Sequence, residues 1–321
     1  MNGAPVADAT ERRIDHLDEA DLTIFQAPWW LDAVSDRQWR AVTEGDGVRA
    51  FLWMPYVQSR KFGMRLLGMP PLTHTLGPVI RVADAQAAAE TRGRLIDAAL
   101  AQLPPHDGFL QVLDPDAGDA LDYACNGLDV QIRYTYRIDT AAGADALWLG
   151  LKQRTRNKLR RAMRSMRVEE TLSLMAFHAF YEANLHKRGL LNDHDRGLYE
   201  RLDVALGRRS RHCILVAADR ATGAQQAAVL LVWDRRTLYY LRSTRDPEAD
   251  SGGAVSLLVW EAIKLAAEKR LAFDSDSFLG RGGALFMETF SARPVARLAI
   301  SRRCLRLRAV ETLERLVAGG A

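Results

Sequence analysis

Residues 254–274 read AVSLLVWEAIKLAAEKRLAFD, and this stretch decides the fold. Apolar side chains recur at helical spacing over residues 254–269, and the short apolar run at 271–274 has the length and composition of a buried strand. The apolar and aromatic run at 237–243, which precedes them, is also predicted to be a strand. A strand, a long helix and a second strand in this order indicate an architecture in which the helix packs on a sheet.

A similar order of elements occurs in both halves of the chain. Each half reads as a helix, antiparallel strands, a second helix and a strand, which is a weak internal repeat. The sequence therefore predicts an α/β (α+β) fold of two related subdomains, residues 1–143 and 144–321, each a mixed, mostly antiparallel sheet flanked by helices. The principal predicted helices are 85–103, 144–166, 174–188, 196–206, 254–269 and 304–318, and the principal strands are 39–42, 48–57, 109–113, 130–138, 212–218, 226–232, 237–243, 271–274 and 295–301.

The composition is that of a folded protein. The 321 residues are 48% hydrophobic and 26% charged, with a mean hydropathy of −0.17, which excludes wholesale disorder. No run approaches the roughly 20 uncharged apolar residues of a membrane span, and the N-terminus lacks an apolar signal segment. We therefore expect a cytoplasmic protein of unknown oligomeric state.

Motifs exclude several classes of enzyme. No GxSxG, P-loop, HExxH or GxGxxG pattern is present, which disfavours hydrolases, kinases, metalloproteases and dinucleotide-dependent enzymes. Three scattered cysteines, Cys125, Cys213 and Cys304, have no metal-ligand spacing. They are predicted to be buried free thiols, and no metal site is expected.

Residues 152–167 hold eight basic side chains and no acid. Their charge is twice the net charge of +4 of the whole chain, so the remainder carries a net charge of −4. Apolar residues recur between them at helical spacing, which predicts a helix that buries one stripe and exposes its cations. The cations are Lys152, Arg154, Arg156, Lys158, Arg160, Arg161, Arg164 and Arg167.

Two interpretations of this basic helix stay open. It is either an ordinary solvated face, with cations favoured near the C-terminal end of the helix, or a binding surface for an anion. Like charges three or four residues apart repel each other, and no acids relieve that repulsion here. An anionic partner such as a nucleotide diphosphate, the 3′-phosphate of CoA or tRNA would do so. No aromatic residues are interleaved, so a base-stacking surface is not indicated.

Five segments, in their order, resemble the FemAB-like branch of the GNAT acyltransferase superfamily. The resemblance extends over roughly residues 24–302, and its strongest parts are Arg154–Ala162 and the helix and strand that end at Asp274. The segments are FQAPWWLDAV (25–34), MPPLTHTLGPVI (69–80), LWLGLKQRTRNKLRRAMRSMRVEE (147–170), FHAFYEANLHKRG (177–189) and SGGAVSLLVWEAIKLAAEKRLAFDSDSF (251–278).

The resemblance implies two GNAT-like subdomains and the transfer of an acyl group to an amine. It implies acyl-CoA or aminoacyl-tRNA as the donor. The acceptor is then an amine on a small molecule, often anionic or nucleotide-linked, in cell-envelope or polysaccharide biosynthesis. A rival hypothesis is a non-catalytic module on the same fold that binds an anionic ligand or RNA through its basic helix.

Two departures from the family pattern bear on these implications. The glycine-rich turn that holds a pyrophosphate in CoA-binding relatives corresponds to Ser251, Gly252 and Gly253 here, which we take as candidate cofactor-binding residues. Three acids, Asp246, Glu248 and Asp250, precede this turn and would repel a pyrophosphate. The lysine that follows a phenylalanine in Fem-type transferases is replaced, because Met287 follows Phe286.

The chemistry of amide formation selects the candidate catalytic residues. A neutral amine must meet an activated carbonyl, lose a proton and leave an oxyanion that needs a donor. GNAT-like folds arrange these groups where two central strands splay apart, here the strands at 237–243 and 271–274. Asp274, Tyr240 and Asp276 are the candidate catalytic residues, although Asp274 is equally well explained as the cap of a turn. Tyr239 alternates with Tyr240, so one of the two faces the core.

Further residues are expected to bind substrate. Arg188 follows a predicted helix, and its neighbour Gly189 is predicted to end that helix. The substrate-binding candidates are Arg154, Arg156, Lys158, Arg160, Arg188, Arg242, Ser243, Phe286 and Glu288. The late loop that carries Phe286 and Glu288, together with Arg293, is expected to cover the pocket. His74 is a weaker candidate for moving a proton, since a loop histidine is more often structural.

Overall fold

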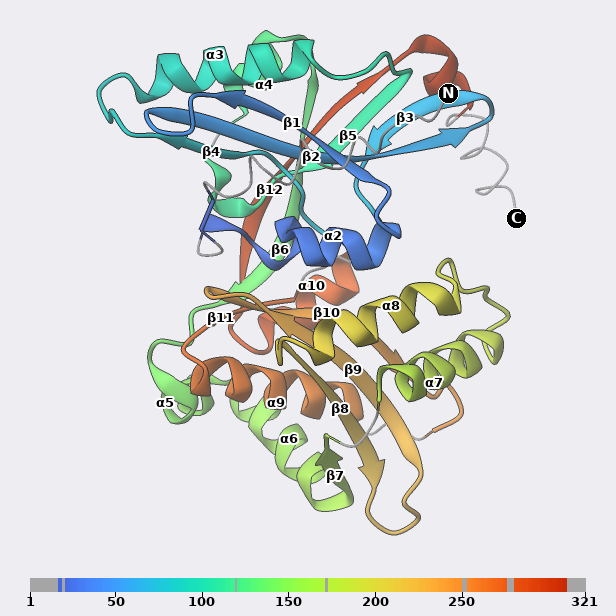
Figure 1. The fold of residues 1–321 in the computed structure, drawn as a ribbon. Coiled ribbons are helices and arrows are strands. Elements are labelled where there is room, and N and C mark those ends of the chain that lie inside the picture. The colour runs from blue at the N-terminus through green and yellow to red at the C-terminus, as the bar shows by residue number, and fades with distance from the viewer. Residues whose placement is uncertain are drawn as a thin grey trace. The chain divides into compact units, whose positions relative to one another are not determined.

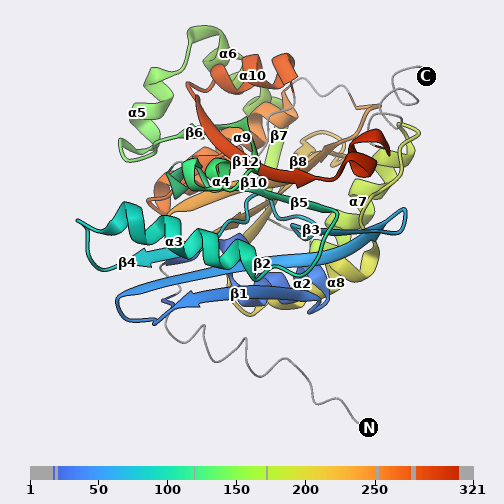
Figure 2. The same ribbon diagram turned by 90° about the horizontal axis from the view of Figure 1, so that it is seen from above.

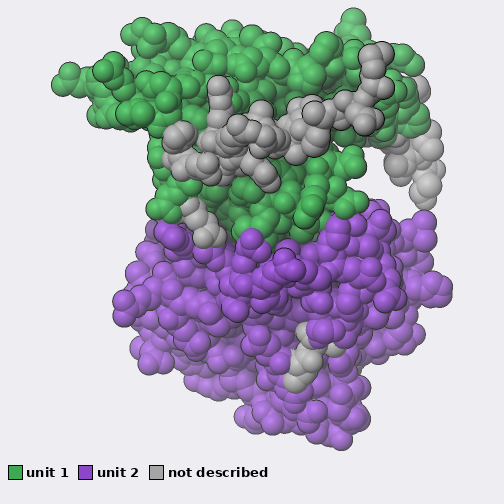
Figure 3. Space-filling view, in the orientation of Figure 1, with its two compact units in different colours: residues 1–133, 296–321 green, residues 134–295 purple. Residues whose placement is uncertain are grey.

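The computed structural model describes residues 17–18, 21–118, 120–170, 173–249, 253–275 and 280–310. The chain divides into two compact units, residues 1–133 with 296–321 and residues 134–295 (Figure 3). Each unit has helices packed on strands (Figure 1), and most neighbouring strands are antiparallel. The predicted mixed α/β class with mostly antiparallel sheets is therefore confirmed.

In unit 1 the strand order is β1-β2-β3-β5-β12. Strand β4 pairs with Ala50–Trp53 of β2, on the edge opposite β1. All pairs are antiparallel except β3 with β5. Helices α3 (Ala88–Ala101) and α4 (Leu121–Cys125) supply the apolar side chains that cover one face, and α3 lies across β1, β2 and β4 (Figure 2). The strands are β1 (Trp39–Gly45), β2 (Ala50–Lys61), β3 (Met64–Gly68), β4 (Val79–Val82), β5 (Gly108–Val112) and β12 (Arg293–Arg303).

The strands predicted at 39–42 and 48–57 correspond to β1 and β2, which pair as an antiparallel hairpin. One carboxylate oxygen of Asp46 accepts hydrogen bonds from the backbone N–H groups of Val48, Arg49 and Ala50 at 2.8–3.2 Å. Gly45 has a φ of +99°, and a Cβ there would lie 2.2 Å from the carbonyl oxygen of Ala50. The turn therefore requires a glycine at this position.

In unit 2 the strand order is β11-β10-β9-β8-β7, and the last residues of β6 pair with β11. Here β10 and β11 are parallel and the other pairs are antiparallel. These strands are β6 (Asp129–Ile138), β7 (Met166–Glu169), β8 (His212–Asp219), β9 (Gln225–Trp233), β10 (Thr237–Arg245) and β11 (Ala272–Asp274).

Helices cover both faces of the unit 2 strands (Figure 1). The apolar helix α9 (Ala254–Glu268) buries nine of its residues against one face, which confirms the helix at 254–269. Helices α5 (Gly143–Gly150) and α6 (Gln153–Ser165) pack beside α9. Helices α7 (Leu174–His186) and α8 (Arg196–Gly207) pack on each other, and α7 lies on β9 and β10.

The predicted helix at 144–166 is wrong in one respect, because the chain breaks it into α5 and α6. Leu151 and Lys152 between the two helices have extended backbone angles. The guanidinium of Arg156 donates to the carbonyl oxygens of Leu149 and Leu151 at 2.7 and 2.6 Å. These bonds satisfy carbonyls that the end of α5 leaves unpaired, which stabilises the break.

A second correction concerns the expected late loop, which contains helix α10 (Gly280–Glu288). Three glycines in GRGGALFME lower its helix propensity, so the sequence is typical of a loop. Tertiary packing overrides this preference, since Met287 is only 7% exposed and lies in the core of unit 2.

The two units divide the chain at different places from the predicted subdomains. The boundary between residues 143 and 144 falls inside unit 2, after the part of β6 that pairs with β11. Residues 296–321 belong to unit 1 because β12 pairs with β5 from Ala299 opposite Val112 to Arg303 opposite Gly108. A pairing so distant in sequence leaves no local signal. Residues 305–310 are helical, as predicted for the start of the last helix, and the rest of that prediction lies outside the described residues.

Candidate active site

The pairing of β10 with β11 is short, and it ends at the position where the sequence predicts a splay. The two strands run parallel from Thr237 opposite Ala272 to Tyr239 opposite Asp274. There β11 ends, whereas β10 continues to Arg245. Against β9, β10 also has a bulge between Tyr240 and Arg242. A bulge leaves one residue outside the ladder and changes the direction of its neighbours' side chains.

The bulge places Tyr240 and Arg242 in different surroundings. Tyr240 packs in the core cluster with α9, edge-on to the ring of Phe273 at 6.3 Å between centroids. Arg242 lies over the ring of Tyr181 in α7, with its guanidinium carbon 4.7 Å from the ring centroid. On a regular strand two residues so spaced share one face. The structure therefore does not bring these two predicted site residues together.

Of the two neighbouring tyrosines, Tyr239 has a structural role. It is 1% exposed, and its hydroxyl donates to a carboxylate oxygen of Asp234 at 3.0 Å. The hydroxyl of Tyr240 has no hydrogen-bond partner of ordinary geometry among the described residues. Burial raises the pKa of Tyr240 to about 12, and the Ser243 side chain opposes that rise only weakly. At neutral pH Tyr240 is therefore a protonated hydroxyl that can donate.

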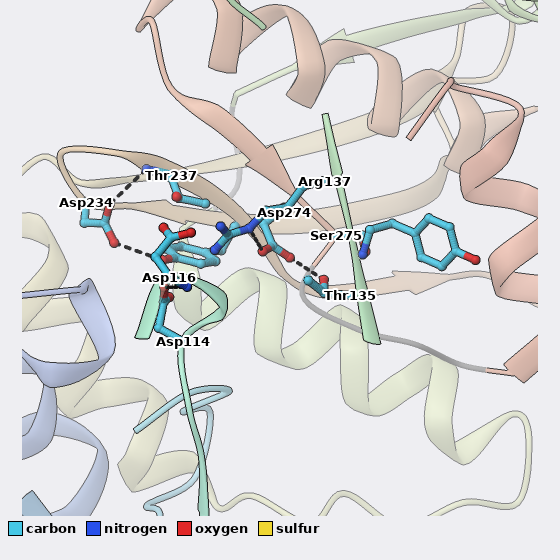
Figure 4. Close-up of polar contacts among 10 residues, drawn as sticks. Asp114, Asp116, Thr135, Arg137, Asp234, Thr237, Asp274 and Ser275 are labelled. Atoms are coloured by element: carbon cyan, nitrogen blue, oxygen red, sulfur yellow. Dashed lines mark hydrogen bonds and ion pairs between the residues drawn. The ribbon is translucent and has the colours of Figure 1, made fainter. Parts of the chain in front are cut away.

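Asp274 is held from two sides. It is 0% exposed, and its carboxylate accepts from the hydroxyl of Thr135 at 2.5 Å and from Nε of Arg137 at 2.7 Å (Figure 4). Both partners lie on β6, so the carboxylate fastens β11 to β6. These contacts occupy both oxygens and give Asp274 a structural role between two strands, while its role as the cap of a turn stays a prediction. A catalytic role for it stays a prediction.

Arg242 belongs to a second group of enclosed polar side chains. Tyr199 of α8 is buried, and burial raises its pKa to about 12 although the charge of Arg242 lowers it. Among the described residues, neither Nε of Arg242 nor the hydroxyl of Tyr199 has a hydrogen-bond partner of ordinary geometry, although both atoms are buried and the two side chains are close enough for Arg242 to lower the pKa of Tyr199. More than nine in ten buried polar groups are paired in folded proteins, so a ligand or an ordered water is expected to complete this group.

His194 precedes α8 and is electrostatically coupled to the same group. Burial lowers the pKa of the half-buried imidazole, and the charge of Arg242 lowers it further. The ring is therefore largely neutral at pH 7 and can accept a proton. His194, Tyr181 and Tyr199 are not among the site residues predicted from the sequence. Their segments show only ordinary helical and loop patterns, and the side chains meet Arg242 through tertiary packing.

Arg188 lies at the far end of β10. Its guanidinium donates to the carbonyl oxygen of Arg245 at 2.6 Å. Gly189 has a φ of +67°, and its N–H bonds to the carbonyl of His186, so the predicted helix end is confirmed. Lys187 pairs with Asp246 and Glu248 at 2.9 Å each, which offsets two of the acids expected to repel a pyrophosphate.

The basic helix α6 lies against the N-terminus of α9. Gly253 is the N-cap of α9, and a Cβ there would lie 3.0 Å from Cβ of Ala162 and 3.8 Å from Cε of Lys158. Only a residue without a side chain permits this approach, and its φ of +138° also favours glycine. The positive end of the α9 dipole and a lysine are thereby brought together, which is an arrangement that attracts anions.

The cations of α6 separate into two kinds. Arg156 is tied to backbone carbonyls, and Arg160 lies over the ring of Trp148 and donates to Asn157, so both have structural partners. Arg154, Lys158 and Arg161 are exposed. Their spacing of four and three residues puts them on one stripe of the helix. Lys158, the middle residue of the stripe, is the one that lies beside Gly253.

The residues of α10 predicted to be functional differ in how far they are exposed to solvent. Phe286 is partly buried, with Nζ of Lys158 6.0 Å from its ring centroid. Glu288 is exposed. Met287 packs in the core, so the residue that replaces the family lysine points away from solvent. Ser243 and Arg293 are exposed.

The remaining predicted residues lie away from this site or outside the residues that the structure describes. Asp276, Ser251, Gly252 and Asp250 lie outside the described residues. His74 is in unit 1, where it stacks on Phe25. The three cysteines are free, but only Cys213 is buried, whereas Cys125 is exposed. Within the described ranges, no group of three or more His, Cys, Asp or Glu side chains has the geometry of a metal site. No helix there is long and apolar enough to cross a bilayer.

Comparison with known proteins gives matches at the level of domain and fold. Residues 152–284 match the family described as "Acetyltransferase (GNAT) domain". The crystal structure of FemX superposes with a TM-score of 0.65 at 13% identity, over 94% of this chain and 97% of that one. No curated protein sequence matches the chain.

Two further solved structures share the fold. L-PGS from Bacillus licheniformis has a TM-score of 0.57 at 13% identity, over 100% of this chain and 99% of that one. The C-terminal domain of a putative lysylphosphatidylglycerol synthetase from Agrobacterium fabrum has a TM-score of 0.55 at 16% identity, over 97% of each chain.

The GNAT domain runs from the start of α6 into α10, so it contains the splay, the Arg242 group and the α6–α9 junction. The predicted resemblance and the predicted enzyme class are confirmed. The chain is an acyltransferase whose residues 152–284 form a GNAT domain, on a fold like that of FemX.

Proposed function

We propose that the protein is an N-acyltransferase that moves an activated acyl or aminoacyl group onto an amine of an anionic acceptor. The observation that carries this proposal is the bulge in β10, which directs Tyr240 toward the side of α9 and Arg242 toward α7. Two substrates can then approach one strand end from opposite faces. The donor takes the side of α6 and α9, and the acceptor takes the side of Arg242.

The donor side is defined by positive charge. The stripe of Arg154, Lys158 and Arg161 extends over about 10 Å of helix. One diphosphate needs less than this length, whereas a polynucleotide backbone presents phosphates along all of it. The stripe therefore favours aminoacyl-tRNA as the donor and leaves acyl-CoA as the alternative. The N-terminus of α9 beside Lys158 would hold the phosphate nearest to the reacting group.

The acceptor side is defined by the open polar group. An anionic group of the acceptor would pair with the guanidinium of Arg242 and receive a hydrogen bond from Tyr199. His194 is neutral near pH 7 and would take the amine proton as the carbon–nitrogen bond forms. The ester or thioester bond then breaks with its electron pair on the leaving oxygen or sulfur, which receives the proton. The backbone of the bulge and the protonated Tyr240 are the candidates for stabilising the oxyanion.

The setting of the reaction is also part of the proposal. The fold of FemX and of L-PGS supports a role in envelope biosynthesis. The acceptor would be a nucleotide-linked or peptide amine, and a cytoplasmic location stays a prediction.

The test supplies the purified protein with two donor pools, namely tRNA charged with labelled amino acids and a set of labelled acyl-CoA esters. Acceptors are nucleotide-linked amino sugars, lysine-containing anionic peptides, and vesicles that contain phosphatidylglycerol. Label should move from charged tRNA to an anionic amine. Transfer only from acyl-CoA would overturn the assignment of tRNA as the donor. Transfer to phosphatidylglycerol, which accepts through a hydroxyl group, would overturn the assignment of an amine as the acceptor. Failure of every pairing would overturn the proposal.

Arg242→Met is the matched loss-of-function variant, and Arg208→Met is its control. Arg208 is an exposed cation at the end of α8, outside the Arg242 group. The first variant should lose transfer, while the second should keep it. Equal activity of the two variants would exclude Arg242 from the acceptor site.

A further inference from the structure

A cavity of about 510 Å³ opens on the sheet of unit 1, outside the GNAT domain. Its walls follow the register of four strands. Ser59 of β2 is opposite Leu66 of β3, which is opposite Gly108 of β5, which in turn is opposite Arg303 of β12. Residues opposite each other on neighbouring strands project to the same face. The cavity is therefore a feature of one sheet face.

Glycines create the hollow. Gly68 of β3 lines the cavity, and a Cβ at this position would meet nothing nearer than the carbonyl oxygen of Leu110 at 3.6 Å. At Gly108 a Cβ would instead lie 2.6 Å from a methyl group of Leu307, which forms part of the wall. Gly68 thus leaves open space that a larger side chain would occupy. The volume is in the range of small-molecule sites, about 300–1,000 Å³.

The chemistry of the wall is apolar with a cationic edge. Leu66, Phe109, Leu110 and Leu307 line it, and Leu110 is 39% exposed although it lies within a strand. Arg133 and Arg303 line it too, and none of the lining residues is acidic. No ion-pair partner of Arg133 occurs among the described residues. An apolar wall beside two guanidinium groups complements an apolar chain that ends in an anion.

We propose that this cavity binds a single-chain amphiphile with an anionic head group, either a carboxylate or a phosphate. The chain lies on Leu66, Leu110 and Leu307, and the head group pairs with Arg133 and Arg303. This site shares no residue with the proposed transfer site. The test of this site is therefore independent of the donor and acceptor proposed above.

The test is calorimetric titration of the full chain with four ligands of equal chain length, each below its micelle concentration. Dodecanoate and dodecyl phosphate should bind. Dodecanol should bind at least tenfold more weakly, and dodecylamine should show no saturable binding. Preference for dodecyl phosphate would indicate a lipid head group as the natural anion, whereas preference for dodecanoate would indicate a fatty acid. Equal binding of dodecylamine and dodecanoate would overturn the proposal.

Two variants locate the site. Gly68→Val fills the hollow and should abolish binding of both anions. Arg133→Gln, at an exposed position, should lower the affinity for both anions at least tenfold and leave the affinity for dodecanol unchanged. Arg60→Gln is the control, because Arg60 alternates with Ser59 on β2 and faces away from the cavity. Folding is checked by circular dichroism. Full affinity in both test variants would place the ligand elsewhere, and transfer activity should be unchanged in all three.

Discussion

Asp274 and Arg242 are both enclosed ionisable residues near the splay of β10 and β11, yet their surroundings are opposite. Asp274 has each carboxylate oxygen engaged by a partner on β6. Arg242 stacks on Tyr181, and its buried Nε is unpaired among the described residues. The fold has satisfied the first residue and left the second incomplete. A buried group that the fold leaves unpaired is where a ligand gains most, because the cost of desolvation has already been met.

Removal of Asp274 should have the largest effect and should act on stability. Asp274→Ala removes a fully buried carboxylate that accepts from Thr135 and Arg137, so we expect the free energy of unfolding to fall by about 3–5 kcal/mol. Denaturant unfolding followed by circular dichroism measures this. Asp234→Ala, which removes another buried carboxylate that bonds to a tyrosine, is the comparison. Normal stability of Asp274→Ala together with complete loss of transfer would reverse the comparison and make Asp274 catalytic.

Substitution of Arg242 should act on transfer instead. A hydrogen bond to a charged group contributes about 1.5–3 kcal/mol, so Arg242→Lys should lower kcat/KM by about 10- to 150-fold. Because Nε has no partner of ordinary geometry among the described residues and a lysine keeps the positive charge beside Tyr181, stability should change by less than about 1 kcal/mol. Steady-state kinetics with a saturating donor and denaturant unfolding measure the two quantities. A large loss of stability would show that Arg242 is structural, like Asp274.

The stripe on α6 predicts a smaller effect that also identifies the donor. Arg161→Gln removes one exposed cation of the stripe, and Arg208→Gln removes one outside it. If the donor is tRNA, the slope of log affinity against log salt should fall by about 0.7–0.9 for the first variant only. Filter binding over a range of salt concentrations gives these slopes. Identical slopes for the two variants would mean that the stripe is an ordinary solvated face.

The fold follows from local sequence patterns more directly than the site does. Helix α9 and the strands on either side of it have strong periodicity, and the structure reproduces them. The break at Leu151 depends on Arg156 reaching back to carbonyls of α5, and α10 forms despite three glycines because Met287 is buried. Both outcomes depend on tertiary contacts, which residue spacing along one segment does not record.

The candidate site illustrates the same limit. Alternation along β10 predicts that Tyr240 and Arg242 share a face, and one bulged residue at Leu241 reverses this. Asp274 and the residues of α6 were predicted from sequence, whereas Tyr199 and His194 come near Arg242 only because α7 packs on β10 and α8 packs on α7. The register of a strand is set by its partners, so the face on which a side chain lies cannot be derived from that strand alone.

The comparison predicts a pH dependence for the Arg242 group. Burial and Arg242 hold the pKa of His194 below its usual 6.5. The neutral ring that can accept the amine proton therefore persists at pH 6.5, and kcat should decline only as the pH falls through a lower apparent pKa. Arg242→Met removes the neighbouring positive charge, so the midpoint of the decline should move up toward 6.5 in the activity that remains. If kcat of His194→Gln falls with pH in the same way as kcat of the wild type, another group accepts the proton. Arg208→Met should keep the wild-type profile, which separates the effect of this one charge from the net charge of the chain.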